Sequence, residues 1–194
     1  MPKDERTKIM IKPWTKLSST KLANYRIFSI RSDVKISPRT GAQHDFFVID
    51  SVDWVNVAAV TPDNQLVMVE QFRHGSETVE LEIPGGVMDP ADKSPLDTGC
   101  RELMEETGYA GENPQIVGKI LPNPAIMHNT CYTVFVENCK CAGSVKFDPS
   151  EDVETRLVPL DEVEDLVASG KIRHSLVVVA LYHFYLWRKR HGRA

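Results

Sequence analysis

Three glutamates follow an arginine in the stretch RELMEETGY, residues 101–109. On a helix, Glu102, Glu105 and Glu106 are three or four residues apart and therefore lie near one face. Like charges at these spacings repel, and each close pair destabilises an isolated helix by about 0.2–0.5 kcal/mol. Mg²⁺ or Mn²⁺ would explain the cluster, because these ions prefer carboxylate oxygens and keep waters and substrate phosphates around them. A solvated acidic face is the alternative interpretation.

The acidic stretch ends a helix that the sequence predicts over residues 95–108. Apolar residues recur at helical spacing through this range, and Gly108 is a suitable C-cap. Arg101 can offset part of the repulsion by pairing with Glu105 one turn later.

The surrounding elements alternate between strand and helix. Residues 25–36 and 44–51 carry strand-like alternation, and SPRTGAQ between them predicts a turn. Further strands or extended stretches are predicted around residues 55–60, 66–73, 80–90, 115–122, 131–139 and 155–160, and further helices around residues 161–170 and 175–190. This order favours an α/β domain built around one sheet, preceded by a small antiparallel piece.

The bulk properties exclude several classes of protein. A net charge of −4 and a pI near 5.9 argue against a nucleic-acid binder. No signal sequence is apparent at the N-terminus, and the apolar run at residues 176–187 is too short and too interrupted for a membrane span. Four cysteines without a zinc pattern are typical of reduced thiols in a cytoplasmic protein.

The acidic motif resembles the Nudix box, in which a glycine and a glutamate precede REUxEExGU, U being a bulky apolar residue. Gly86 starts the box, and residues 101–109 fill its second half completely. The first half departs from the family pattern. Fourteen residues separate Gly86 from Arg101, one more than in the family, and Asp92 or Lys93 stands where the family has its first glutamate.

The resemblance extends over roughly residues 50–185. EQFRHGSETVELEIPGG looks like a segment of the ADP-ribose and nucleotide-sugar pyrophosphatases, and Pro124, sixteen residues after Gly108, is a mark of the ADP-ribose subgroup. The resemblance implies a Nudix α/β/α sandwich with a mixed sheet at residues 51–194. It also implies a small antiparallel β subdomain at residues 1–50, which helps to build a homodimer.

By this resemblance, the acidic residues and their neighbours are expected to bind a metal ion. Glu102 and Glu106 are the expected Mg²⁺ ligands, together with the backbone carbonyl of Gly85, and Glu105 lies close by. Arg101 holds a helix carboxylate in place.

The general base is expected from the loop KFDPSEDVE, residues 146–154. Glu151 matches the family best, and Asp152 and Glu154 are rivals. His128 is a further alternative. A mobile loop of this kind would align water when it closes over the substrate.

The substrate site is expected to combine a cation, a carboxylate and an aromatic ring. Arg73 can fork onto a phosphate or a ribose-bearing group, and Glu82 could position the sugar or help to bind metal. A base stacks on an aromatic side chain. The residues that complete this set are Trp54, Phe46, Phe47 and Pro124, with Trp14 from the same or a partner subunit.

The sequence therefore predicts Mg²⁺-dependent hydrolysis of ADP-ribose or another nucleoside diphosphate sugar. Two alternatives remain. The first is a Nudix enzyme for a nucleoside triphosphate, a dinucleoside polyphosphate or coenzyme A. The second is a sensor that binds ADP-ribose or a nucleotide sugar without turnover.

Overall fold

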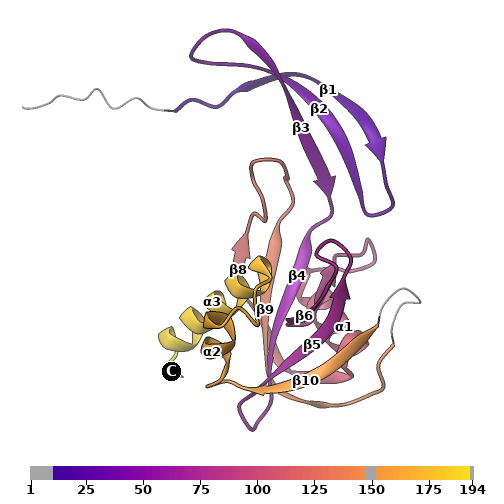
Figure 1. The fold of residues 1–194 in the computed structure, drawn as a ribbon, viewed down its shortest axis with the longest axis vertical. Coiled ribbons are helices and arrows are strands. Elements are labelled where there is room, and N and C mark those ends of the chain that lie inside the picture. The colour runs from indigo at the N-terminus through magenta and orange to yellow at the C-terminus, as the bar shows by residue number, and fades with distance from the viewer. Residues whose placement is uncertain (1–10, 147–151, 193–194) are drawn as a thin grey trace, which may run out of the picture. The chain divides into compact units, whose positions relative to one another are not determined.

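The computed structural model describes residues 11–146 and 152–192 (Figure 1). Contacts divide the chain into two compact units. The first comprises residues 1–51 and 123–128, and the second comprises residues 52–122 and 129–194. Glu151, the predicted base, lies outside the described residues.

The described part of the first unit is a three-stranded antiparallel sheet in the order β1-β2-β3. Its strands are β1 (Thr15–Asn24), β2 (Phe28–Ile36) and β3 (Gln43–Ser51). The sequence predicted β2 and β3 but not β1. The pairing of β1 with β2 shifts register between Lys16 and Ser18 and again near Ala23. These bulges break the alternation of side chains, so β1 lacks the period of two that identifies a strand.

A buried carboxylate connects β1 and β2 of the first unit through hydrogen bonds. Asp33 is 1% exposed and accepts a hydrogen bond from the Ser19 hydroxyl at 2.6 Å and from Arg31 Nε at 3.1 Å. The Ser19 hydrogen bond is the largest influence that lowers the pKa of Asp33. The segment 123–128 joins this unit through a hydrogen bond from the Ile49 N–H to the Ile126 carbonyl.

The second unit contains a seven-stranded mixed sheet in its described residues. Its central order is β10-β5-β4-β9-β8, with β6 paired to β5 and β7 paired to β4. β4 and β9 run parallel, whereas the other pairs are antiparallel. The strands are β4 (Trp54–Val60), β5 (Gln65–Arg73), β6 (Thr78–Glu82), β7 (Gly85–Val87), β8 (Tyr109–Ile120), β9 (Cys131–Cys141) and β10 (Val153–Pro159).

Helices cover both faces of this sheet. Successive apolar residues of β4 and β5 point to opposite faces, which explains why both strands are continuously apolar. One face packs against α1 (Pro95–Thr107), and the other packs against α2 (Val163–Ala168) and α3 (Ser175–Arg190) (Figure 1). The predicted α/β/α sandwich is therefore confirmed. Among the described helices, none is both long and apolar enough to cross a membrane.

β8 begins earlier than the sequence predicted. The prediction placed this strand at residues 115–122, but pairing with β9 already starts at Tyr109. The first half of β8 contains Gly111 and Asn113, whose residue types favour turns, and the pairing there is irregular. Local turn signals thus concealed a strand that its neighbour in the sheet stabilises.

Candidate active site

The acidic helix α1 is fixed at both ends. The Ser94 side chain accepts a hydrogen bond from the Asp97 N–H at 3.2 Å, and Pro95 occupies the first turn. At the other end Gly108 adopts the left-handed conformation with φ 72°, and its N–H donates to the Met104 carbonyl. The predicted C-cap is confirmed, and it ends the helix directly after its glutamates.

The three glutamates of α1 have different surroundings. Glu106 is 4% exposed, whereas the side chains of Glu102 and Glu105 are 13% and 40% exposed. The backbone N–H of Gly85 donates to Glu106 Oε2 at 3.1 Å. A solvated acidic face is therefore wrong for Glu106, because this carboxylate is buried against the start of β7.

The two glycines of β7 allow this close approach. A Cβ added to Gly86 would lie 2.8 Å from Glu102 Oε2 and closer still to Oε1. A Cβ added to Gly85 would overlap the backbone oxygen of Val55. Glycine is thus required here for space, since any side chain would displace either a carboxylate or the neighbouring strand.

Arg101 connects the helix to the loop before it. Its Nη1 lies 2.9 Å from both Glu102 Oε1 and Glu105 Oε2, so the predicted pairing with Glu105 is confirmed. Its Nε and Nη2 donate to the two carboxylate oxygens of Asp92 at 3.2 and 2.9 Å, and Nη2 also donates to the Val87 carbonyl. Asp92 or Lys93 stands where the family has its first glutamate, and in the structure Asp92 is the one that accepts hydrogen bonds from Arg101.

The role of Asp92 as the partner of Arg101 was not predicted from the sequence. The hydrogen bonds from Arg101 outweigh the effect of burial, and with further donors from Asp89 N–H and the Thr98 hydroxyl they hold the pKa of Asp92 at about 2. The sequence left Asp92 and Lys93 as alternatives at the family's glutamate position. The two-oxygen contact of Asp92 with Arg101 depended on the loop conformation.

Replacement of Asp92 by asparagine is expected to lower the free energy of unfolding by about 1–2 kcal/mol at pH 7, because charged hydrogen bonds to Arg101 are lost. The folded-state pKa lies below the ordinary value of 3.8, so this stabilisation is present above pH 3.8 and is lost as the pH falls toward 2. Unfolding curves of both proteins between pH 7 and pH 2 test this. Curves that stay equally far apart throughout would contradict it.

Arg73 and Glu82 form a second charged group. Arg73 Nε and Nη2 donate to the two oxygens of Glu82 at 2.8 and 2.7 Å, and His174 Nδ1 lies 2.9 Å from Glu82 Oε2. Glu82 is 1% exposed. Burial opposes its ionisation, but the hydrogen bonds from Arg73 and His174 prevail and hold its pKa at about 2. Glu82 is therefore a buried carboxylate anion, three residues before Gly85.

The predicted aromatic residues are distributed over the two units. Trp54 is half-buried in β4 of the second unit. Phe46 belongs to the first unit, where its ring meets Trp14 edge-on at 5.3 Å, and Pro124 belongs to the same unit. Phe47 is 63% exposed in β3.

The described alternatives for the base are all solvent-accessible. Asp152 is exposed, and Glu154 pairs with Arg156 at 2.6 Å. His128 belongs to the first unit, where its Nδ1 lies 3.4 Å from Asp50 Oδ1.

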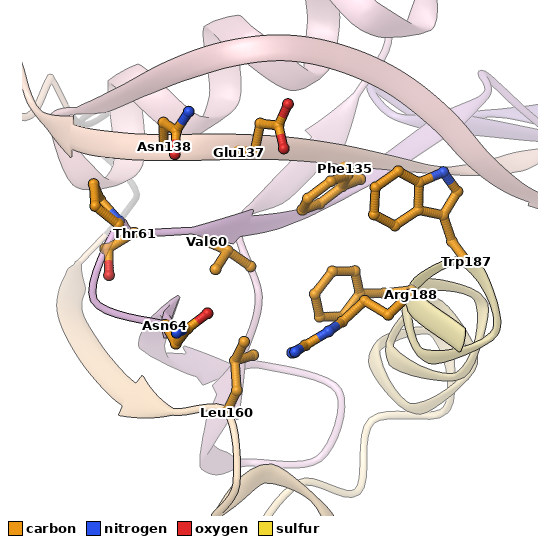
Figure 2. Close-up of a pocket in the computed structure, with 11 residues that line it drawn as sticks. Val60, Thr61, Asn64, Phe135, Glu137, Asn138, Leu160, Trp187 and Arg188 are labelled. Atoms are coloured by element: carbon orange, nitrogen blue, oxygen red, sulfur yellow. The ribbon is translucent and has the colours of Figure 1, made fainter. Parts of the chain in front are cut away.

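A pocket of about 320 Å³ lies on the face of the sheet that α3 covers (Figure 2). Phe135 and Phe184, which line it, are core residues and nearly inaccessible. The Trp187 indole N–H donates to Gln115 Oε1, so this ring is held in place by β8. The described lining contains no residue of α1, and the pocket is therefore separate from the acidic site.

The acidic site offers oxygen ligands for a hard divalent cation. Among the described residues, no three His, Cys, Asp or Glu side chains gather into a metal-binding group. Glu102 and Glu106 nevertheless bring carboxylate oxygens next to Gly85 and Gly86, and oxygen is the ligand atom that Mg²⁺ prefers, with waters and substrate phosphates completing its shell. These residues therefore fit a metal that the protein and its substrate hold together.

Comparison with known proteins identifies the family. The model of the NUDIX domain matches residues 51–178. The chain belongs to the NUDIX family. The methanol dehydrogenase activator of Bacillus methanolicus is 30% identical over 133 residues, which cover 68% of this chain and 71% of that protein. The ADP-ribose pyrophosphatase of Bacillus subtilis (strain 168) is 29% identical over 133 residues, which again cover 68% of this chain and 71% of that protein.

Two further matches cover nearly the whole chain. The ADP compounds hydrolase NudE of Escherichia coli (strain K12) is 24% identical over 96% of this chain and 99% of that protein. A crystal structure of an ADP compounds hydrolase superposes with a TM-score of 0.83 at 22% identity, covering 95% of this chain and 99% of the other. The predicted Nudix fold and the prediction of a hydrolase are thus confirmed, and Nudix hydrolases generally use a divalent metal.

Proposed function

We propose that this Nudix hydrolase cleaves the diphosphate linkage of ADP-ribose or another nucleoside diphosphate sugar, with Mg²⁺ or Mn²⁺ as cofactor. The products are a nucleoside monophosphate and a sugar phosphate. The observation that carries the proposal is the buried Glu106 beside Glu102, which lie against Gly85 and Gly86 of β7. The names of the relatives in Bacillus subtilis and Mus musculus, an ADP-ribose and an ADP-sugar pyrophosphatase, support this class of substrate.

The metal is held by the carboxylates of Glu102 and Glu106 and by the carbonyl of Gly85. When bound, Mg²⁺ neutralises phosphate charge, orients the diphosphate and acidifies a bound water. Arg101 keeps the carboxylates of Glu102 and Glu105 in fixed positions, because its Nη1 lies within 2.9 Å of each. Glu105, the most exposed of the three, is the carboxylate that can assist a water at the edge of the site.

The remaining roles concern water activation and substrate binding. Glu151 removes a proton from the attacking water, with Asp152 and Glu154 as alternatives. Arg73 binds the diphosphate, and Glu82 orients Arg73 through two hydrogen bonds. Residues proposed to contact the base or ribose are Trp54, Phe46 and Pro124.

The first unit is proposed to dimerise with a second copy of the chain. β1 forms one edge of its sheet, and several large apolar side chains of the unit are exposed. These residues are Trp14, Leu17, Leu22, Tyr25, Ile27 and Phe47. We also propose a cytoplasmic location without nucleic-acid or membrane partners, which the four unpaired cysteines and the acidic pI support.

A panel of diphosphates with Mg²⁺ tests the proposed function. ADP-ribose, GDP-mannose and UDP-glucose are compared with a dinucleoside polyphosphate, coenzyme A and a nucleoside triphosphate, and products are separated by chromatography. Cleavage of ADP-ribose into AMP and ribose 5-phosphate is expected, and a chelator should abolish it. Faster cleavage of a compound without a sugar-linked diphosphate would contradict the substrate class.

A broader set of ADP-containing substrates is the second candidate. It is favoured by the similarity to NudE, because that match extends over 96% of the chain and the relative is named as a hydrolase of ADP compounds. Comparable rates for ADP-ribose and other ADP compounds would support it. Binding of ADP-ribose without any turnover would instead support a sensor.

A further inference from the structure

Two buried glutamates on β6 pair with two successive residues that precede α3. Glu80 and Glu82 are alternate residues of the strand and therefore share a face. Arg173 Nη2 lies 2.6 Å from Glu80 Oε1, and His174 Nδ1 lies 2.9 Å from Glu82 Oε2. The segment before α3 is thus attached to β6 by one side-chain contact per residue.

The two pairs differ in what else the glutamate holds. Besides Arg173, Glu80 contacts the Thr78 hydroxyl, which lies on the same strand. Glu82 also accepts two hydrogen bonds from the Arg73 guanidinium, one on each carboxylate oxygen. Rotation of the Glu82 carboxylate would therefore turn the plane of the Arg73 guanidinium with it.

The His174 side chain points to Glu82 and does not cap its own helix. It stands at the N-cap position of α3 with an extended backbone, but its side chain makes no capping hydrogen bond. The imidazole instead reaches Glu82, 92 residues earlier in the chain. Because Glu82 is almost completely buried, a third contact on its carboxylate restricts its rotamer as well as compensating its charge.

We propose that His174 is a positioning residue for substrate binding, acting through Glu82 to hold the Arg73 guanidinium in the orientation that receives a phosphate of the nucleotide sugar. The inference rests on the proposed function, in which Arg73 binds the diphosphate. It assigns to the start of α3 a role in the affinity for the anionic part of the substrate. If Arg73 is already oriented in the free protein, the substrate does not have to supply the free energy for ordering it. Loss of this orientation should therefore raise KM more than it lowers kcat.

Three single variants separate positioning from general stability. His174→Leu removes the donor, whereas His174→Asn places an amide nitrogen where Nδ1 stands. Arg173→Leu is the matched control, because it breaks the neighbouring pair, which does not involve Arg73. With ADP-ribose and saturating Mg²⁺, His174→Leu is expected to raise KM about tenfold with kcat within about twofold. His174→Asn and Arg173→Leu should keep KM within about twofold.

A double variant tests whether His174 acts through Arg73. Arg73→Gln is expected to raise KM by itself, and adding His174→Leu should then raise it no further. Thermal unfolding of each variant identifies any that is not folded at the assay temperature, and for those His174→Ala, which also removes the donor, replaces His174→Leu in both backgrounds. Independent, multiplying effects on KM would overturn the proposal, as would an unchanged KM in His174→Leu.

Calorimetric binding of ADP-ribose distinguishes failure of this inference from failure of the proposed function. If the wild-type protein binds ADP-ribose without cleaving it, the proposed hydrolysis is wrong, and a dissociation constant about tenfold weaker in His174→Leu still supports the positioning role. If the wild-type protein cleaves ADP-ribose and the variants are indistinguishable from it, the positioning role alone is wrong. Absence of both binding and cleavage in the wild-type protein overturns both.

Discussion

Replacing Glu106 by glutamine is expected to lower kcat for ADP-ribose roughly a thousandfold while the protein remains folded. The glutamine has the shape of the glutamate, and its side-chain oxygen can still accept the Gly85 N–H that Glu106 Oε2 accepts at 3.1 Å. The negative charge is lost, however, and with it a ligand that a divalent cation requires. The variant therefore separates the contact with β7 from the charge that we propose as a metal ligand.

Turnover at saturating ADP-ribose, the midpoint of thermal unfolding and calorimetric binding of Mn²⁺ are the three measurements for this variant. Glu164→Gln is the matched control, because it removes one charge from an exposed position on α2. The control should retain wild-type kcat and metal affinity. Near-normal turnover in Glu106→Gln would show that the metal assignment is wrong.

The acidic helix could be predicted closely because its signals are local. Its apolar spacing, the run of glutamates and the glycine at its end lie within one short segment, and the structure places the helix at Pro95–Thr107 with Gly108 as its cap. The resemblance of this segment to a family motif then indicated the fold of the larger unit. The prediction of the helix and of the fold thus depended mainly on one short segment of the sequence.

The contacts that orient the site could not be predicted, because they join residues far apart in the sequence. Nothing near His174 indicates that it meets Glu82, and the two approach only once β6 and the start of α3 are packed. β1 was missed for a different reason. Its bulges interrupt the alternation of side chains, and its exposed surface lacks the apolar pattern of a half-buried strand.

The distribution of charge explains how the acidic helix can be stable. Glu106 is buried against a backbone donor, and Arg101 lies within hydrogen-bonding distance of Glu102, Glu105 and Asp92. One guanidinium therefore faces three carboxylates. The excess negative charge that remains at this end of α1 is what a divalent cation would neutralise.

Gly86→Ala is expected to lower the activity about a hundredfold with little change in thermal stability. The added methyl group would overlap the Glu102 carboxylate, 2.8 Å from Oε2 and closer to Oε1. The tip of a side chain moves more readily than backbone, so the carboxylate is displaced from the position in which Arg101 Nη1 holds it at 2.9 Å. Metal affinity should fall together with kcat.

Two glycine variants and one double variant make this test specific. Gly75→Ala should behave as the wild-type protein, because a Cβ there meets nothing within 4 Å. Gly85→Ala should instead unfold at a lower temperature, because its Cβ would overlap a backbone oxygen of β4 that cannot move aside. Adding Glu102→Asp to Gly86→Ala shortens the displaced side chain and should restore part of the activity lost by Gly86→Ala. If the losses caused by Gly86→Ala and by Glu102→Asp alone simply multiply in the double variant, the glycine does not act through the carboxylate beside it.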